Sequence, residues 1–292
     1  MPPFRLAHLS DPHLPPPAGS EGGLEPKRLL SRFAWRRKRR RHDPAILAAI
    51  VADVQAARPD HVAITGDLTN FSTAAELAAA RRWLEALGPA DRVTVSPGNH
   101  DALVGAPDND RFAAWEPWLG DEGGVAFPKI RRRGPVALIN LCSATPTAFH
   151  LAQGALGREQ LEPLGGLLRG AREAGLFRVL LIHHPPGPGV VSARKSLRAP
   201  ERLLAILEEA GVELVLHGHA HEATVATVQG PRGAIPVLGV PPASGAGGHG
   251  ERARWHEIAV AGGTGAWEVQ VTARGLDAEG QAGELGRYRL AS

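Results

Sequence analysis

The sequence predicts an α/β fold with a mixed, largely parallel first sheet and a second, mostly antiparallel sheet from the C-terminal part. Between residues 5 and 216, short β-branched and aliphatic runs alternate with helical stretches, as in stacked βαβ units. After residue 221, short alternating runs are separated by Gly and Pro without a helical period, which indicates antiparallel strands. No polar linker divides the two parts. We therefore expect one domain over residues 1–292, with a core at 4–221 and a β-rich tail at 222–292 that packs against it.

The strands of the core are expected where β-branched and aliphatic residues run together, at residues 5–9, 61–65, 92–96, 136–141, 178–182 and 213–216. Those of the tail are expected at 223–228, 235–240, 255–260, 267–272 and 287–290. Helices fall between the strands of the core. Asp43 and Pro44 supply an N-cap and a first helical residue, and Ser72 and Thr73 precede a second helical run. The four expected helices start at 44 and cover 74–87, 158–172 and 200–210, with Gly88, Gly175 and Gly211 as C-caps of the last three.

The composition indicates that the chain can fold without disulfides or a structural metal. Hydrophobic residues make up 43% and charged residues 22% of 292 residues, enough for a core without disulfides. The single cysteine, Cys142, excludes an intramolecular disulfide and is expected as a buried strand thiol. The N-terminus lacks the pattern of a signal peptide, and no run approaches eighteen apolar residues, so we expect a cytoplasmic protein without a membrane span.

Five of the predicted strands run directly into short clusters of metal-competent side chains. Loops at the carboxyl ends of strands in an open α/β sheet converge on one edge, so these clusters can share a site. Carboxylate, amide and imidazole ligands without a thiolate suit Mn, Fe or Zn. The clusters are Asp11-Pro12-His13, Gly66-Asp67, Gly98-Asn99-His100-Asp101, His183-His184 and His217-Gly218-His219-Ala220-His221.

Each cluster also has a purely structural interpretation. Asp11-Pro12-His13 could be only a turn, and Asn99 could simply occupy a left-handed position. Five such coincidences at five strand ends would be needed, which favours a metal site. Ligands one residue apart, as in Asp11 with His13 and His219 with His221, are expected to point the same way along an extended segment.

These clusters resemble the motifs of the calcineurin-like metallophosphoesterases, which read D-x-H, G-D, G-N-H-D/E, H and G-H-x-H. The match extends over residues 11–221, and the His-His-Pro-Pro and G-H-A-H runs look most like the bacterial class III cyclic-nucleotide and glycerophosphodiester phosphodiesterases. The resemblance implies a four-layer α-β-β-α sandwich and two divalent or trivalent metal ions. It implies Asp11, His13, Asp67 and His221 as ligands of one metal, and Asp67, Asn99, His183 and His219 as ligands of the other. By alignment, His183 rather than His184 is the ligand.

Four residues beside the implied ligands are candidates for other roles. If Asn99 is a ligand, the diverging side chain of His100 is better placed to donate to the phosphate or leaving oxygen, with Asp101 orienting its ring. The resemblance implies a similar role for that histidine. His184 and His217 could contact the substrate or support the metal ligands, or could be buried structural histidines.

An inserted basic element is expected at about residues 24–42. It holds nine Lys or Arg and one Glu, a local charge of +8 in a chain whose total is +3. As a helix it would have a narrow apolar face of Leu29, Leu30, Phe33 and Ala34, with Trp35 at its margin. Three interpretations remain open for 24–41: a solvated helix docked by that face, attachment to an anionic membrane surface, or nucleic-acid binding, which so few aromatic residues favour least.

The sequence thus predicts a metal-dependent phosphodiesterase that hydrolyses a small phosphodiester or nucleotide-type substrate with hydroxide activated by two metal ions. One alternative is a lipid-directed pyrophosphatase or phosphodiesterase, acting on a substrate such as a nucleotide-diphospho-lipid, peripheral on the inner face of the membrane. Another is a non-catalytic scaffold with the same fold. A full set of oriented ligands argues against the scaffold. The sequence makes no prediction of oligomeric state.

Overall fold

The chain forms two six-stranded sheets, seen in a computed structural model that describes residues 2–20, 25–38, 41–105, 111–247, 251–277 and 279–290. The first sheet has the order β12-β11-β10-β1-β2-β3, and its strands are β1 (Phe4–Leu9), β2 (His61–Ile64), β3 (Val93–Val95), β10 (Arg254–Gly263), β11 (Ala266–Leu276) and β12 (Ala282–Leu290). The second has the order β4-β5-β6-β7-β9-β8, and its strands are β4 (Lys129–Arg133), β5 (Val136–Asn140), β6 (Phe177–Leu181), β7 (Leu214–His217), β8 (Thr224–Gly230) and β9 (Gly233–Gly239).

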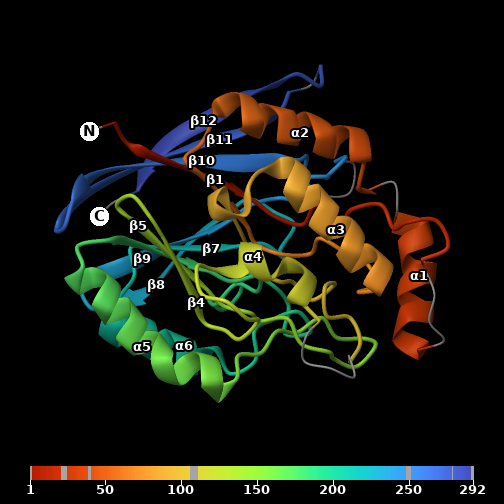
Figure 1. Ribbon diagram of the computed structural model, residues 1–292, viewed down its shortest axis with the longest axis horizontal. Helices are drawn as coiled ribbons and strands as arrows, with labels where there is room; N and C mark the ends of the chain where they lie inside the picture. The colour runs from red at the N-terminus through yellow and green to blue at the C-terminus, as the bar shows by residue number, and fades with distance from the viewer. Residues whose placement is uncertain are drawn as a thin grey trace.

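Helices cover the outer face of each sheet, which gives the four layers that the sequence resemblance implied (Figure 1). The helices are α1 (Pro26–Lys38), α2 (Pro44–Ala57), α3 (Ala74–Leu87), α4 (Glu116–Leu119), α5 (Arg158–Glu173) and α6 (Pro200–Ala210). Helices α2 and α3 pack on the first sheet through residues such as Ile50 and Leu84, and α5 and α6 pack on the second through residues such as Leu164 and Leu207. A third core lies between the sheets, where Leu6 and Ile258 of one sheet share a cluster with Leu181 of the other.

The predicted division of strands between the sheets is wrong in one respect. The tail does not make a sheet of its own, because β10 pairs antiparallel with the free edge of β1 and β9 pairs parallel with β7. Both sheets are therefore mixed. Each half of the tail extends an edge that the parallel core strands leave open, and this pairing buries backbone groups that would otherwise be exposed.

The start signals of the helices work as the sequence predicts. The Asp43 carboxylate accepts from the Ala45 N–H at 2.8 Å. Thr73 and Glu76 form a reciprocal capping box at the start of α3. Strand β4 was not predicted, because its sequence, KIRRR, reads as a charged surface segment. The Lys129 ammonium and Arg131 guanidinium nevertheless lie inward and donate to carbonyl oxygens of the 117–123 loop region.

Two smaller expectations can also be checked. Cys142 is buried directly after β5, and burial raises the pKa of its thiol to about 12, as expected of an unreactive cysteine. Among the described helices, none combines the length and the apolar character needed to cross a membrane.

Candidate metal centre

The five motif loops follow the carboxyl ends of β1, β2 and β3 in the first sheet and of β6 and β7 in the second. Backbone hydrogen bonds tie neighbouring loops together: Asp11 N–H donates to Gly66 O and His13 N–H to Asp67 O, both at 3.0 Å. In the second sheet, Gly218 N–H donates to His183 O at 3.1 Å. The sheet edges thus bring residues that are up to two hundred positions apart into one place.

One group at this edge combines Asp11, His13, Asp67 and His221. Its candidate ligand atoms all lie within 4.8 Å of one another. His221 Nε2 is 3.2 Å from Asp11 Oδ1, and His13 Nε2 is 3.8 Å from Asp67 Oδ2. All but His221 are buried. This is a preformed arrangement of two carboxylates and two imidazoles.

A second group lies on the other side of Asp67. His183 Nε2 is 3.4 Å from Asp67 Oδ2 and 3.2 Å from Asn99 Oδ1, and the ring of His219 is 5.0 Å from that of His183. The same oxygen of Asp67 therefore faces both groups, while its other oxygen accepts from His100 N–H at 2.8 Å. Asp67 therefore lies between the two groups of candidate ligands.

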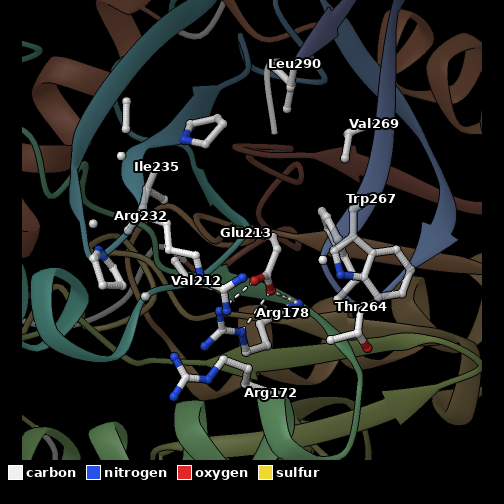
Figure 2. A pocket seen from close by; sticks show the side chains of 18 of the residues that line it. Arg172, Arg178, Val212, Glu213, Arg232, Ile235, Thr264, Trp267, Val269 and Leu290 are labelled. Carbon is white, nitrogen blue, oxygen red and sulfur yellow. Dashed lines mark hydrogen bonds and ion pairs between the residues drawn. The ribbon is translucent and has the colours of Figure 1, made fainter.

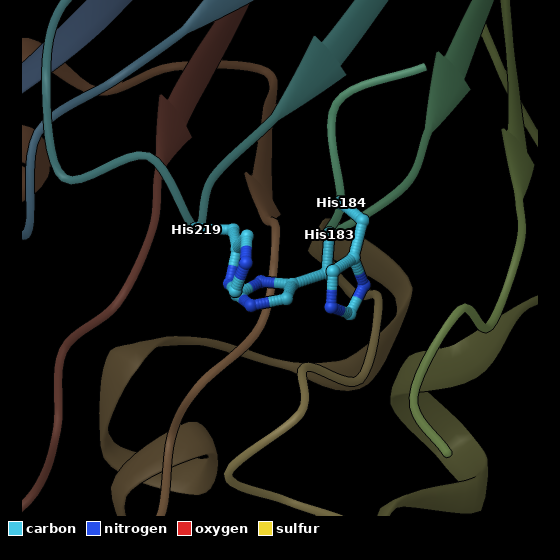
Figure 3. Close-up of side chains that lie close together, drawn as sticks. All are labelled: His183, His184 and His219. Atoms are coloured by element: carbon cyan, nitrogen blue, oxygen red, sulfur yellow. The ribbon is translucent and has the colours of Figure 1, made fainter. Parts of the chain in front are cut away.

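The structure separates the roles of the adjacent histidines (Figure 3). His183 Nδ1 donates to the Thr65 carbonyl at 2.6 Å, which fixes the ring and directs Nε2 toward Asp67 Oδ2 and Asn99 Oδ1, where a metal ion could replace the proton on Nε2. Both nitrogens of His184 have protein partners, Ser143 Oγ at 2.7 Å and the Ala152 carbonyl at 3.3 Å. His184 packs with its ring 4.3 Å from His219. His183, His184 and His219 could together hold a metal ion, since their candidate ligand atoms lie within 4.8 Å of one another. The contact of His183 with Asp67 favours His183 as the ligand and His184 as a support for His219.

His217 shows the same kind of satisfied environment. Its Nδ1 bonds to the Gly218 carbonyl at 2.8 Å and its Nε2 to Thr224 Oγ1 at 3.1 Å. The side chain is fully buried, and burial lowers the pKa of the ring to about 4. Of the two interpretations that the sequence left open, the structural one fits His217.

The backbone at the candidate ligands adopts a conformation that the sequence pattern did not indicate. Asp11 and His13 have φ values of 50° and 42°, and His219 and His221 have 65° and 61°. The expected extended segments are thus absent at these pairs. Both residues of each pair are left-handed, a conformation that costs about 1–3 kcal/mol per non-glycine residue. Asp67, with a φ value of 56°, is the fifth candidate ligand in the left-handed conformation.

The motif glycines are explained by how closely the loops pack against the carboxylates. A Cβ on Gly98 would collide with the carboxylate of Asp67. A Cβ on Gly218 would meet Asp11 Oδ2 at 2.5 Å and would also collide with Ser10 Oγ. These positions require glycine because no side chain fits there.

The chemistry of the donors fits metal ions. Among the described residues, both ring nitrogens of His13 are buried without a hydrogen-bond partner, and Asp11 Oδ1 has only ion-pair contacts, with His221 Nε2 at 3.2 Å and His13 Nε2 at 3.9 Å. Such orphaned polar atoms are costly unless a ligand satisfies them. Oxygen and imidazole donors without sulfur match the ions that the sequence suggested.

The electrostatics of the site favour added positive charge. Burial alone would raise the pKa of Asp11 and Asp67, but neighbouring imidazoles, chiefly His221 and His183 respectively, hold both pKa values below their usual range. Although burial acts in the other direction, Asp67 raises the pKa of His183 to about 9. The two carboxylates thus draw a cation to this edge.

The predicted role of Asp101 is wrong. Its buried carboxylate does not orient the His100 ring, because it accepts from the backbone N–H groups of Asp67 and Gly98 at 2.9 and 2.8 Å and from Thr69. In the described structure, the His100 ring is oriented instead by the Asn70 carbonyl, 2.9 Å from Nδ1. Asp101 binds two ligand loops together and has no direct contact with reacting groups. Burial and the charge of Asp67 raise its pKa to about 7.

Sequence reasoning missed one residue of the site, His42. Its ring lies 4.3 Å from that of His13 and 5.8 Å from that of His221, and its Nδ1 bonds to Ser244 Oγ at 2.8 Å. His42 ends the basic insertion and follows no strand, so the rule that located the other histidines could not find it. The only available signal was a histidine beside the Asp43 helix start.

Another cavity in the described part of the chain lies away from this sheet edge. It has a volume of about 360 Å³ and contains the buried ion pair of Arg178 with Glu213, 2.6 Å apart, with Trp267 and Arg172 on its walls (Figure 2). None of the candidate ligands lines it. Its described lining holds no group of metal-competent side chains, so it does not compete with the histidine and carboxylate cluster as the candidate site.

Comparisons with known proteins agree with this geometry. The family model described as calcineurin-like phosphoesterase matches residues 4–223. The chain is 31% identical over 199 residues to a probable cyclic nucleotide phosphodiesterase from Synechococcus sp., covering 66% of this chain and 69% of that protein. It is 27% identical over 237 residues to another from Rhodococcus erythropolis, covering 80% and 68%.

Solved structures show the same fold. A dimetal phosphatase from Danio rerio superimposes with a TM-score of 0.58 at 14% identity and covers 98% of this chain and 99% of that chain. A purple acid phosphatase from yellow lupin gives a TM-score of 0.58 at 13% identity, with 96% and 52% covered. With the motif residues assembled at one sheet edge and the family model matching most of its length, the chain belongs to the calcineurin-like phosphoesterases, a family of phosphoric ester hydrolases.

Proposed function

We propose that the chain is a binuclear metal-dependent phosphodiesterase that hydrolyses a small phosphodiester or nucleotide-type substrate. The observation that carries this proposal is the position of Asp67 Oδ2, 3.8 Å from His13 Nε2 and 3.4 Å from His183 Nε2. A single carboxylate oxygen between two sets of donors is what a pair of metal ions requires. The names of the relatives support a phosphodiester substrate.

The proposed ligands divide around Asp67. Asp11, His13 and His221 would hold one ion with it, and Asn99, His183 and His219 the other. When bound, the two ions make hydroxide available from water near neutral pH and neutralise charge on the phosphoryl oxygens. Mn, Fe and Zn all suit these donors.

His100 supplies what the ligands do not, a proton donor. Its Nδ1 is fixed on the Asn70 carbonyl, and its ring lies edge-on 5.0 Å from that of His13. In the protonated ring, Nε2 can donate to the leaving oxygen as the phosphoester bond breaks. The carbonyl of Asn70 keeps the ring in the orientation that this step needs.

Metal analysis together with hydrolysis of bis(p-nitrophenyl) phosphate tests the proposal. Protein loaded with Mn, Fe or Zn should hold two ions per chain and release p-nitrophenol, and Asp67→Asn should lose both properties. Asp60→Asn is the matched control, because Asp60 is exposed and precedes the start of strand β2, whereas Asp67 follows its end. One ion per chain would contradict the binuclear centre, and two ions without hydrolysis would favour the scaffold.

A second candidate is a lipid-directed pyrophosphatase or phosphodiesterase, favoured by the orientation of α1. The expected docking through the apolar face is not what the structure shows: Leu29, Leu30 and Phe33 are 44%, 50% and 58% exposed. The helix is instead held by Lys27, which donates to Thr147, and by Arg28, which donates to the Phe71 and Ser72 carbonyls. An outward apolar face on a basic helix suits an anionic lipid surface.

Vesicle sedimentation tests this candidate. Vesicles with anionic phospholipid should retain the protein in a salt-dependent way, and vesicles of phosphatidylcholine alone should not. Leu30→Ser should weaken the retention, whereas Val225→Ser, which changes an exposed residue on β8, should not. Equal behaviour of the protein with both vesicle types would exclude an electrostatic role for α1.

A further inference from the structure

A small cavity opens beside the proposed metal centre. Its volume is about 190 Å³, and its apolar walls include Trp35, Pro15 and Leu47. Its polar lining is confined to His13, His42 and Ser244. His13 is one of the proposed metal ligands, so the cavity continues from the point where the phosphate would be held.

We propose that this cavity binds a heteroaromatic ring of the substrate, a nucleobase, through stacking on Trp35 and polar contact with His42. This inference rests on the proposed phosphodiesterase function, whose substrate it specifies. Neither Trp35 nor His42 belongs to the motifs of the metal site. The inserted segment between β1 and α2 therefore contributes the proposed specificity.

The size and chemistry of the cavity select the ring over other groups. Pockets that hold a whole drug-sized ligand measure about 300–1,000 Å³, so this cavity suits one part of a ligand. A polyol such as glycerol would lose hydrogen bonds to water against walls of Trp35, Pro15 and Leu47. A planar ring presents apolar faces to such walls and polar atoms at its edge.

Trp35 is held in place before any ligand arrives. Its ring packs edge-on against Phe71 at 5.8 Å. Helix α1 is fixed on that same residue by Arg28 Nε, which donates to the Phe71 carbonyl at 3.0 Å, and at its start by Lys27 Nζ, 2.9 Å from the Thr147 carbonyl. A preorganised aromatic ring loses little conformational entropy when a base stacks on it.

His42 provides the polar contact. Its Nδ1 is engaged by Ser244 Oγ at 2.8 Å, which sets the plane of the ring. The Nε2 atom can then donate to or accept from the edge of a base. Because the His42 ring also lies 4.3 Å from that of His13, the base and the phosphate would be bound at adjacent positions.

Binding of adenosine 5′-monophosphate and of inorganic phosphate to metal-loaded protein, measured by titration calorimetry, tests the inference. The nucleotide should bind more tightly than phosphate. Trp35→Ala should weaken nucleotide binding by about 5- to 150-fold, the range that base stacking on an aromatic side chain covers, and should leave phosphate binding and metal content unchanged. Trp35→Phe should retain most of the affinity. Leu30→Ala, on the exposed side of the same helix, is the matched control.

The outcomes separate this inference from the proposed function. If the nucleotide binds no more tightly than phosphate, or if Trp35→Ala weakens both equally, the base subsite is wrong even where bis(p-nitrophenyl) phosphate is hydrolysed. If Trp35→Ala selectively loses the nucleotide while the protein hydrolyses no phosphodiester, the subsite stands and the proposed function fails. Should Trp35→Ala perturb α1, the Trp35→Phe and His42→Ala variants still decide, since His42→Ala is expected to weaken the nucleotide more than phosphate.

Discussion

Replacing the two adjacent histidines one at a time separates a metal ligand from its support. His183 is fully buried, with Nε2 3.4 Å from Asp67 and 3.2 Å from Asn99, so His183→Ala removes a donor from the centre itself. His184→Ala removes a ring whose nitrogens are bonded to Ser143 and Ala152, and which contacts the centre only by packing on His219.

The expected magnitudes differ accordingly. Loss of a group that orients a ligand reduces metal affinity by about 10- to 100-fold, or about 1.4 to 2.7 kcal/mol. We expect His184→Ala in this range, because His219 keeps its own bond to the Lys195 carbonyl at 2.9 Å. His183→Ala should exceed it and leave about one ion per chain, since Asp67 and Asn99 then lose the donor between them.

Metal content after dialysis against a graded series of free Mn²⁺ or Zn²⁺ gives both affinities. Unfolding of the metal-free variants in denaturant is the control, because each substitution also empties a buried site and lowers stability. The reasoning would be refuted if His184→Ala held one ion while His183→Ala held two. It would also be refuted if both variants lost metal only in proportion to their loss of stability.

Three further predictions concern single side chains. Asn99→Ala should weaken the binding of one ion and slow turnover while the metal-free protein still folds, because the residue lies in a loop outside the strands. Retention of two ions with full activity would contradict this. Asp53→Ala should lower the free energy of unfolding by about 2 to 3 kcal/mol, because the buried carboxylate accepts from Arg274 at 2.6 Å and from the Trp255 indole N–H at 2.8 Å. A decrease of less than about 1 kcal/mol would contradict this prediction. Burial lowers the pKa of His61 to about 3, so the unfolded chain takes up the proton at a higher pH than the folded chain, and the free energy of unfolding falls as the pH drops below about 6.5, by up to about 1.4 kcal/mol per pH unit. In His61→Gln, denaturant unfolding should show a smaller decrease of this free energy per pH unit, and an unchanged decrease would rule out His61 as its source.

The sequence predicts most of the core because its strands and helices carry local signals. Apolar runs end at a polar cluster in five cases, and the parallel topology then places those clusters together without any knowledge of tertiary contacts. The caps at Asp43 and Thr73 are equally local. The sequence therefore predicts the features that neighbouring residues determine.

Features set by distant packing could not be read in this way. The role of Asp101 depends on backbone donors from Asp67 and Gly98, which its neighbour His100 does not reveal. The left-handed conformation at Asp11 and His13 is accompanied by hydrogen bonds from their N–H groups to the Gly66 and Asp67 carbonyls, which lie more than fifty residues away in the sequence. The basic sequence of β4 does not indicate a buried strand, because the groups that satisfy Arg131 are carbonyl oxygens from another part of the folded chain.

Helix α1 shows most clearly why amphipathic patterning fails as a guide to docking. The pattern assumes that the apolar side chains are buried, but here Lys27 and Arg28 reach the backbone carbonyls of two loops, and these charge-assisted bonds fix the helix from its polar side. In this orientation of α1, Leu30 is exposed and Trp35 lines the cavity beside His13. One helix thereby presents a ring to the site and an apolar face to the outside. Because Arg28 fixes this orientation, Arg28→Ala should change nucleotide affinity and vesicle retention together and leave metal content unchanged. A change in only one of the first two would contradict this account.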